Sequence, residues 1–162
     1  MQGDHTLMGF KLELPTEIMK DIQKIYDNTD EILGEMTRAG AAVVEANMRS
    51  NAPQVLKDYV KVTRTYHTPS DGGINTKVIV KGYIPFSDPN RKGFTRNGGG
   101  GDSYTTDKGV PAEFLANLYE HGRSTAPWPK KPFVRKSFKK KEIEEAMLEA
   151  QSKASGGLLE DE

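Results

Sequence analysis

The sequence lacks cysteine altogether, has a single tryptophan and contains no long run of apolar residues. Without cysteine, the 162-residue chain has neither disulfide bonds nor thiolate metal ligands. No run of about 18 apolar residues is present, so no membrane span is predicted, and the first residues lack the basic-then-apolar order of a secretory signal. Lys plus Arg and Asp plus Glu each number 23. This neutral total argues against a dedicated nucleic-acid coat but leaves room for local basic patches.

The chain is also poor in apolar residues, which make up only 35% of it. A core is expected to be small relative to the surface, so neighbouring subunits are expected to supply part of the stability. The length suits one domain. We predict an N-terminal arm at 1–14, a single domain at 15–153 and a flexible acidic tail at 154–162.

Apolar residues recur at helical spacing between Thr16 and about Ser50, which predicts a long helical segment. Asn28, three residues before Glu31, resembles a capping box, so the segment is either two helices or one bent helix. The helix is expected to end at the Ala52-Pro53 step, because a residue before proline avoids the helical conformation. The predicted apolar stripe consists of Ile18, Ile22, Ile25, Ile32, Met36, Val43 and Val44.

Two alternating segments, 59–67 and 74–83, flank a turn cluster at 69–73 and predict an antiparallel hairpin. In the first segment, Val60, Val62, Arg64 and Tyr66 are predicted to share one face. Residues 86–109 follow, with four consecutive glycines at 98–101. We predict a long structureless loop there, mobile unless a partner orders it.

Two further helices are predicted in the C-terminal part. The first spans Pro111 to His121, with proline at its start and Gly122 after its end. The second runs from Phe133 to about Lys153, and we expect both Phe133 and Phe138 to lie in the core. Three lysines precede the glutamates of this helix, an order that opposes the helix dipole and suits the charges of a partner better. The buried stripe of the first helix is predicted to be Phe114, Leu115, Leu118 and Tyr119.

No residue pattern indicates catalysis, a cofactor or a metal. The glycine run is followed by Asp102-Ser103 and lacks the lysine–hydroxyl pair of a phosphate-binding loop. The glutamates after Lys141 are expected on a solvated face. An enzyme assembled from scattered residues stays as an alternative. The histidines lack metal-ligand spacing and are expected at the surface or an interface. They are His5, His67 and His121.

Basic side chains gather between 123 and 141, with aromatic residues among them. Such a segment can bind nucleic acid, so a small nucleic-acid-binding module using 123–141 is one alternative. A charged face toward an acidic partner subunit is the other. Trp128, between two prolines, either covers the core or anchors an interface. The candidate partner-facing or DNA-facing residues are Lys136, Lys139, Lys140 and Lys141.

Two blocks of the sequence resemble the head–tail joining, or tail-completion, family of long-tailed (siphovirus-like) bacteriophages. The first is a helix, Ala41–Asn51, that runs into the step Ala52-Pro53. The second is the helix end Leu118-Tyr119-Glu120-His121-Gly122, followed by the step Lys131-Pro132-Phe133-Val134-Arg135 into a closing helix. The family usually carries Thr-Gly-x-Leu after the Ala-Pro step, whereas this chain has Gln54-Val55-Leu56-Lys57.

This resemblance implies an α+β fold: a long N-terminal helix or helix pair, a small antiparallel sheet, and a short helix and a C-terminal helix packed on the sheet. It also implies which residues lie in the core or at an interface. They are Pro53, Tyr119, Glu120, Gly122, Trp128, Pro132, Phe133 and Arg135.

The function implied is that of a virion structural protein at the phage neck, without catalysis or cofactor. As a tail-completion subunit, the chain would form a ring, expected to be a hexamer, that joins the tail to the head connector. Tail terminator and connector stopper are neighbouring roles that stay open. The expected partners are further copies of the chain, connector or stopper proteins, and terminator or tail tube proteins. DNA contact is expected only as a channel neighbour, with no membrane, and assembly is expected in the host cytoplasm.

Overall fold

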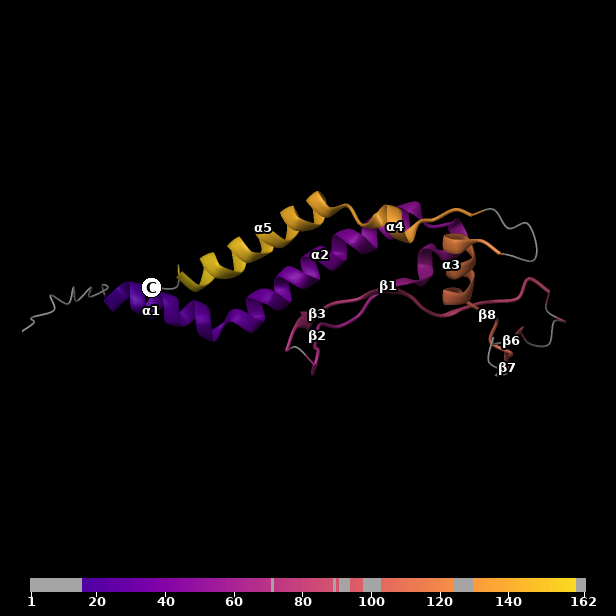
Figure 1. Ribbon diagram of the computed structural model, residues 1–162, viewed down its shortest axis with the longest axis horizontal. Helices are drawn as coiled ribbons and strands as arrows, with labels where there is room; N and C mark the ends of the chain where they lie inside the picture. The colour runs from indigo at the N-terminus through magenta and orange to yellow at the C-terminus, as the bar shows by residue number, and fades with distance from the viewer. Residues whose placement is uncertain are drawn as a thin grey trace, which may run out of the picture.

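The computed structural model describes residues 16–70, 72–88, 90, 94–97, 103–123 and 130–159. Its helices and short antiparallel strand pairs make an α+β fold, which confirms the predicted class (Figure 1). The elements are α1 (Thr16–Asp27), α2 (Thr29–Asn51), the 3-10 helix η1 (Gln54–Tyr59), β1 (Val60–Val62), β2 (Tyr66–His67), β3 (Ile74–Asn75), β4 (Val78–Val80), β5 (Tyr83–Ile84), β6 (Phe94–Asn97), β7 (Ser103–Thr106), β8 (Val110–Pro111), α3 (Ala112–His121), α4 (Val134–Ser137) and α5 (Lys140–Leu159).

Two long antiparallel helices, α2 and α5, form the long axis of the molecule (Figure 1). They approach closely at Gly40, where an added Cβ would lie 3.1 Å from both Cγ and Sδ of Met147. The N-terminal segment forms two helices, with α1 extending beyond the start of α2. The predicted capping box is wrong. The Asn28 side chain donates to the Lys24 carbonyl oxygen at 2.8 Å, so it closes the end of α1 and makes no side-chain cap to α2.

The predicted hairpin is present, and its register shifts by one residue along its length. Val60 pairs with Val80 and Val62 with Val78, whereas Tyr66 pairs with Asn75 and His67 with Ile74. The first strand therefore has one extra residue between the two pairs, as in a β-bulge. Because side chains alternate with period two, the extra residue reverses the faces. The prediction of one face for Val60, Val62, Arg64 and Tyr66 is therefore wrong beyond Val62, and Arg64 is exposed.

The remaining strands lie beyond the hairpin, near α3. Strand β8 pairs with β5, so the chain returns to β5 immediately before it enters α3. Between these two strands, β6 pairs with β7 over four residues. The segment 86–109 is therefore not structureless, since it contains this hairpin, while residues 98–101 lie outside the described part. Gly109 directly precedes β8 and has φ +123°. The absence of a side chain lets its backbone lie close to β5, because a Cβ there would collide with the Ile84 carbonyl oxygen.

The core lies where α2, η1, β1 and α3 meet, below α4. The helix α3 buries Ala112, Ala116 and Glu120. The predicted stripe is only partly correct: Leu115 and Tyr119 pack against the core, but all four of its side chains are half-buried, and the buried positions are two alanines and one carboxylate. The core consists of Val44, Met48, Ala52, Leu56, Val60, Ala112, Ala116 and Phe133.

The predicted last helix is broken in two. Phe133 is 1% exposed and belongs to the core, as predicted, but Phe138 interrupts the helix and is 60% exposed, so its predicted burial is wrong. The break lets α4 stay near α3 while α5 turns along α2. The helix α5 also continues to Leu159, past the predicted end at Lys153. Outside the core, Ile18 and Ile22 of the predicted apolar stripe are exposed.

Candidate functional site

The two halves of the C-terminal motif meet at a buried carboxylate. Glu120, in the last turn of α3, accepts hydrogen bonds through Oε2 from the backbone N–H groups of Phe133 at 2.9 Å and Val134 at 3.0 Å. Its Oε1 accepts a third from the Arg135 N–H at 3.3 Å. These donors begin α4 and have no partner within that helix. The glutamate therefore caps α4 from another helix and positions the Pro-Phe-Val-Arg step.

Two more bonds hold this step in place. The Lys131 N–H donates to the Tyr119 carbonyl oxygen at 2.8 Å. This bond returns the chain to the C-terminal end of α3. The Asn51 side chain donates to Ser137 Oγ at 3.3 Å, which joins the end of α2 to α4. Phe133 inserts into the core between these bonds. The motif is a structural joint between α2, α3 and α4.

The predicted motif residues differ in exposure around this joint. Gly122 ends α3 at φ +80°, a conformation that suits glycine, and its N–H donates to the Leu118 carbonyl oxygen. Trp128 lies outside the described residues, as do His5 and the predicted arm. Among the rest, Glu120 and Phe133 are buried, Pro53, Tyr119, Gly122 and Pro132 are half-buried, and Arg135 is exposed.

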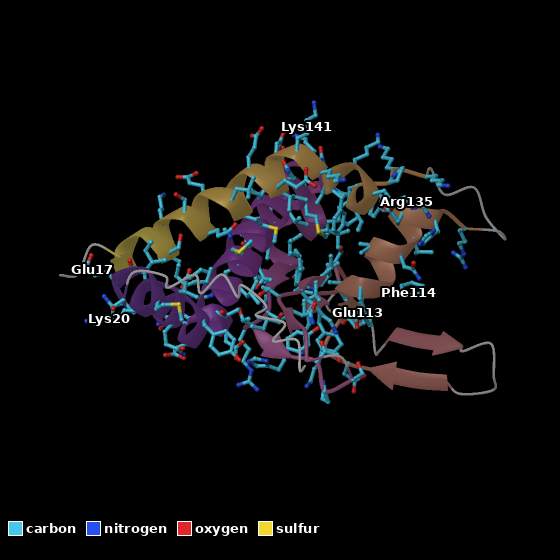
Figure 2. The ribbon with its side chains drawn as sticks, turned by 60° about the vertical axis from the view of Figure 1, so that its left-hand side comes forward. Glu17, Lys20, Glu113, Phe114, Arg135 and Lys141 are labelled. Carbon is cyan, nitrogen blue, oxygen red and sulfur yellow. The ribbon has the colours of Figure 1, made fainter. Side chains whose placement is uncertain are left out.

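The predicted basic residues form an exposed cationic surface over α4 and the start of α5. Between 130 and 141 there are seven Lys or Arg and no Asp or Glu. Lys139 pairs with Glu142 at 2.9 Å, and Lys140 with Glu144 at 3.5 Å. Within the described chain, Lys136 and Lys141 have no ion pair. Figure 2 shows Arg135 near α3, Lys141 on α5, and Glu17 and Lys20 at the far end on α1.

An open groove of about 480 Å³ lies beside this cationic surface, between the hairpin and α5. Val78 and Ile79 of β4 form one wall, and Ile143 and Met147 of α5 form the other. Phe138 lies at one end, and Gly40, Ala41 and Val44 of α2 contribute to the floor. The groove is mostly apolar, with Lys77 among its lining residues. The sequence did not predict this groove, because its lining residues come from three segments that are far apart in the chain. The alternation of apolar residues in β4 was the one part of it that the sequence indicated.

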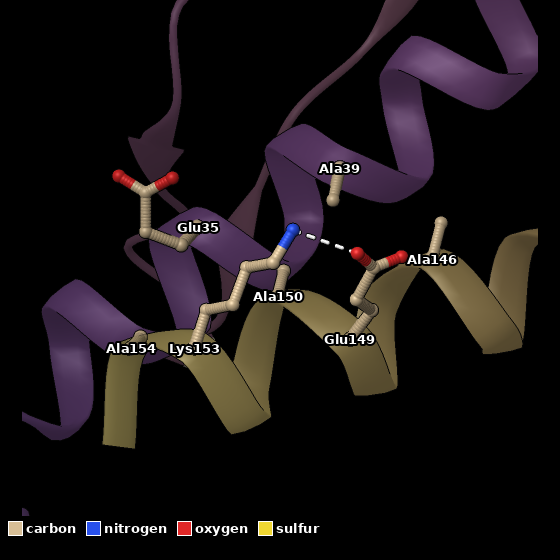
Figure 3. A pocket seen from close by; sticks show the side chains of 7 residues that line it. All are labelled: Glu35, Ala39, Ala146, Glu149, Ala150, Lys153 and Ala154. Carbon is tan, nitrogen blue, oxygen red and sulfur yellow. Dashed lines mark hydrogen bonds and ion pairs between the residues drawn. The ribbon is translucent and has the colours of Figure 1, made fainter. Parts of the chain in front are cut away.

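A second groove follows the other side of the α2–α5 seam (Figure 3). Alanines line much of it, at Ala39, Ala146, Ala150 and Ala154. Its charged groups are Glu35 and the Glu149–Lys153 ion pair, at 2.7 Å. The Lys153 hydrogen bond lowers the pKa of Glu149, so this carboxylate is charged at neutral pH and poorly suited to proton transfer.

His67 and His121, at a strand end and a helix end, are both exposed. Across the part of the chain that the structure describes, no three His, Asp or Glu side chains gather as metal ligands. None of the helices in that part has the length and apolar character to span a bilayer.

A further surface feature is the exposed apolar side of α1. Ile18, Met19, Ile22 and Tyr26 are 45%, 51%, 53% and 74% exposed, and no side chain of α1 is buried. The side of α1 that faces the rest of the molecule carries Asp21, Lys24 and Ile25, all half-buried. The helix therefore presents most of its apolar residues to solvent.

Comparison with known proteins gives one informative match. A family model described as "Bacteriophage HK97-gp10, putative tail-component" matches residues 16–122, about two thirds of the chain. The match covers α1 to the end of α3, including Glu120 and the Ala-Pro step. Neither curated proteins nor solved structures give a match.

Proposed function

The chain belongs to the HK97-gp10-like family of bacteriophage tail components, and we propose that it is the tail-completion subunit, forming a ring that joins the tail to the head connector. The single observation that carries this proposal is the family match over 16–122, which includes the helix–hairpin–helix body. The C-terminal motif, whose halves meet at Glu120, supports the tail-completion role through the resemblance noted above.

The surface of the subunit suits assembly. A ring needs a heterologous interface, in which one face of each copy docks on a different face of the next. The subunit offers two unlike faces: an exposed apolar helix at one end, and a groove beside a cationic surface elsewhere. We expect a hexamer, with connector or stopper proteins on one side and terminator or tail tube proteins on the other. The protein acts in the virion neck as a structural part, without catalysis.

Disruption of the gene in its phage tests this role. We expect filled heads and separate, finished tails that do not join, and we expect joining to be restored by adding the purified protein to the mutant lysate. Overlong tails would instead indicate a terminator, and heads that lose their DNA would indicate a stopper. Infectious particles from the disrupted phage would refute the proposal.

The exposed cationic residues between 130 and 141 favour a second candidate, a nucleic-acid-binding module. This function predicts that the purified protein shifts the mobility of DNA, and that the shift weakens steeply with salt. It also predicts loss of the shift when Lys139, Lys140 and Lys141 become Ala. A protein that leaves DNA mobility unchanged at low salt would exclude this candidate.

A further inference from the structure

Among the residues that the structure describes, none covers the exposed apolar side of α1. The helix is only 12 residues long. Helices of this length are marginal in water, so stability must come from packing of the apolar face. Here Ile18, Met19, Ile22 and Tyr26 are at least 45% exposed. An amphipathic helix with such a face is suited to lie in an apolar groove, with residues at i, i+1, i+4 and i+8 as anchors.

The groove between the hairpin and α5 has the matching chemistry. Val78, Ile79, Ile143 and Met147 line its walls, and the 60% exposed Phe138 stands at its end. Its volume of about 480 Å³ leaves room for several side chains. The exposed Phe138 also gives an incoming helix an aromatic contact, and aromatic residues often dominate such interfaces.

The charges around the two surfaces are opposite in sign. Residues 16–31, which are α1 and the first turn of α2, contain five Asp or Glu and two Lys, for a net charge of −3, of which α1 itself contributes −1. Residues 130–141, beside the groove, carry a net charge of +7. In the described part of the chain, the exposed Glu17, Lys136 and Lys141 have no ion pair. Complementary charges of this kind orient two surfaces and speed their encounter.

The two surfaces cannot meet within one chain. α1 extends from the start of α2 away from the strands and α3 (Figure 1). The groove begins at Thr37, eight residues after α2 starts at Thr29, which is about 12 Å further along the helix. Any contact between α1 and the groove must therefore join different molecules.

We propose that α1 of one copy docks in the groove between the hairpin and α5 of the next copy, with its acidic residues toward the cationic surface. The contact is heterologous, so repetition closes a ring when the rotation between copies allows it. The inference rests on the proposed ring function and adds the two surfaces that join its subunits.

The lack of native cysteine allows a direct test by cross-linking the full-length chain. Two single-cysteine variants, Ile22→Cys on α1 and Phe138→Cys at the groove, are mixed and treated with a short bismaleimide. We expect a covalent dimer in the mixture and almost none in either variant alone. Leu148→Cys is the matched control, because Leu148 is 62% exposed on α5 and does not line the groove. Its mixture with Ile22→Cys is expected to stay monomeric.

A second test leaves the groove unchanged. Ile22→Gln places a polar side chain on the apolar side of α1, and Lys20→Gln makes the same replacement at an exposed position outside that side. We expect Ile22→Gln to weaken self-association about tenfold or more, measured by sedimentation, since anchor residues dominate such contacts. Lys20→Gln should change it less than about threefold. Both variants should keep the helical circular dichroism of the parent.

Several outcomes would overturn the inference. Cross-linking within a single variant would indicate a symmetric contact, and equal yields with Leu148→Cys would indicate random collision. Cross-linking of Phe138→Cys to Leu12→Cys, but not to Ile22→Cys, would assign the groove to the N-terminal arm. Multimers of the parent protein without the expected cross-link would refute this interface and leave the ring intact. Failure of the ring itself would appear separately, as normal joining of heads and tails in the disrupted phage.

Discussion

Replacing Glu120 tests whether the buried carboxylate holds the C-terminal part of the fold together. Glu120→Ala leaves the N–H groups of Phe133, Val134 and Arg135 without their acceptor. A hydrogen bond to a charged group contributes about 1.5–3 kcal/mol, and leaving buried donors unpaired adds a penalty. Because the third bond is long and two of the three bonds are only part-buried, we expect a total loss of about 3–5 kcal/mol.

The loss should appear as a lower midpoint in thermal or denaturant unfolding. For a chain of 162 residues, each kcal/mol shifts the melting temperature by about 2–4 °C, so Glu120→Ala should melt about 6–20 °C lower. Circular dichroism at 222 nm follows the transition. Glu120→Gln keeps the shape but points an amide N–H₂ at backbone donors, and about half the effect is expected.

The control for Glu120 is its ion-pair partner. Arg135 Nε lies 3.4 Å from Glu120 Oε1, and the arginine side chain is 69% exposed. An exposed pair contributes about 0–1 kcal/mol, so Arg135→Ala should lower stability by no more than about 1 kcal/mol. If Arg135→Ala destabilised the protein as much as Glu120→Ala, the ion pair would be the stabilising interaction and the capping argument would be wrong.

Three other predictions follow from the packing of the helices. Phe133→Ala should lower the free energy of unfolding by about 3–5 kcal/mol, because it empties the core, and a melting shift below about 2 °C would contradict this. Gly34→Ala should raise the free energy of unfolding, measured in urea, by up to about 1 kcal/mol. Gly40→Ala should not show this gain, because its Cβ would lie only 3.1 Å from the Met147 side chain of α5. Bonds from lysine and asparagine lower the pKa of Glu142, so their stabilisation is present above about pH 4.3 and is lost as the pH falls below that. Glu142→Gln should lower the melting temperature at pH 7, by an amount that shrinks as the pH falls through the acid range, and Glu145→Gln should have little effect at any pH.

The sequence pattern predicted the helices and the hairpin, because the apolar spacing there was regular over many residues. It could not separate Phe133 from Phe138, since both aromatics flank the same short basic run. Glu120 accepts hydrogen bonds from the backbone at the start of α4, where Phe133 enters the core, whereas Phe138 follows the end of α4. This contact joins distant segments, and local spacing does not report such contacts.

Part of the joint was still visible in the sequence. Ala112, Ala116 and Glu120 recur at intervals of four and lie on the same side of α3. The larger neighbours Leu115 and Tyr119, which pack against the same core while half-buried, drew the prediction away from the alanines. A helix that packs closely against a neighbour places small residues at the contact. A glutamate on the same side of the helix as two alanines therefore indicates a buried carboxylate with hydrogen-bond partners. The β-bulge after Val62 had no such signal, as alternation continues through it.

The charges of α2 and α5 support the proposal that the cationic surface faces a partner. In α2, Asp30 and Glu31 lie in the first turn and Arg49 in the last, the order that the helix dipole favours. α5 begins with Lys140 and Lys141, and Glu142 and Glu144 only partly neutralise this end. One helix therefore follows the dipole rule and the other opposes it. The helix that opposes the rule borders the groove, and none of the described residues covers the apolar side of α1. The contact that we propose between copies accounts for both features.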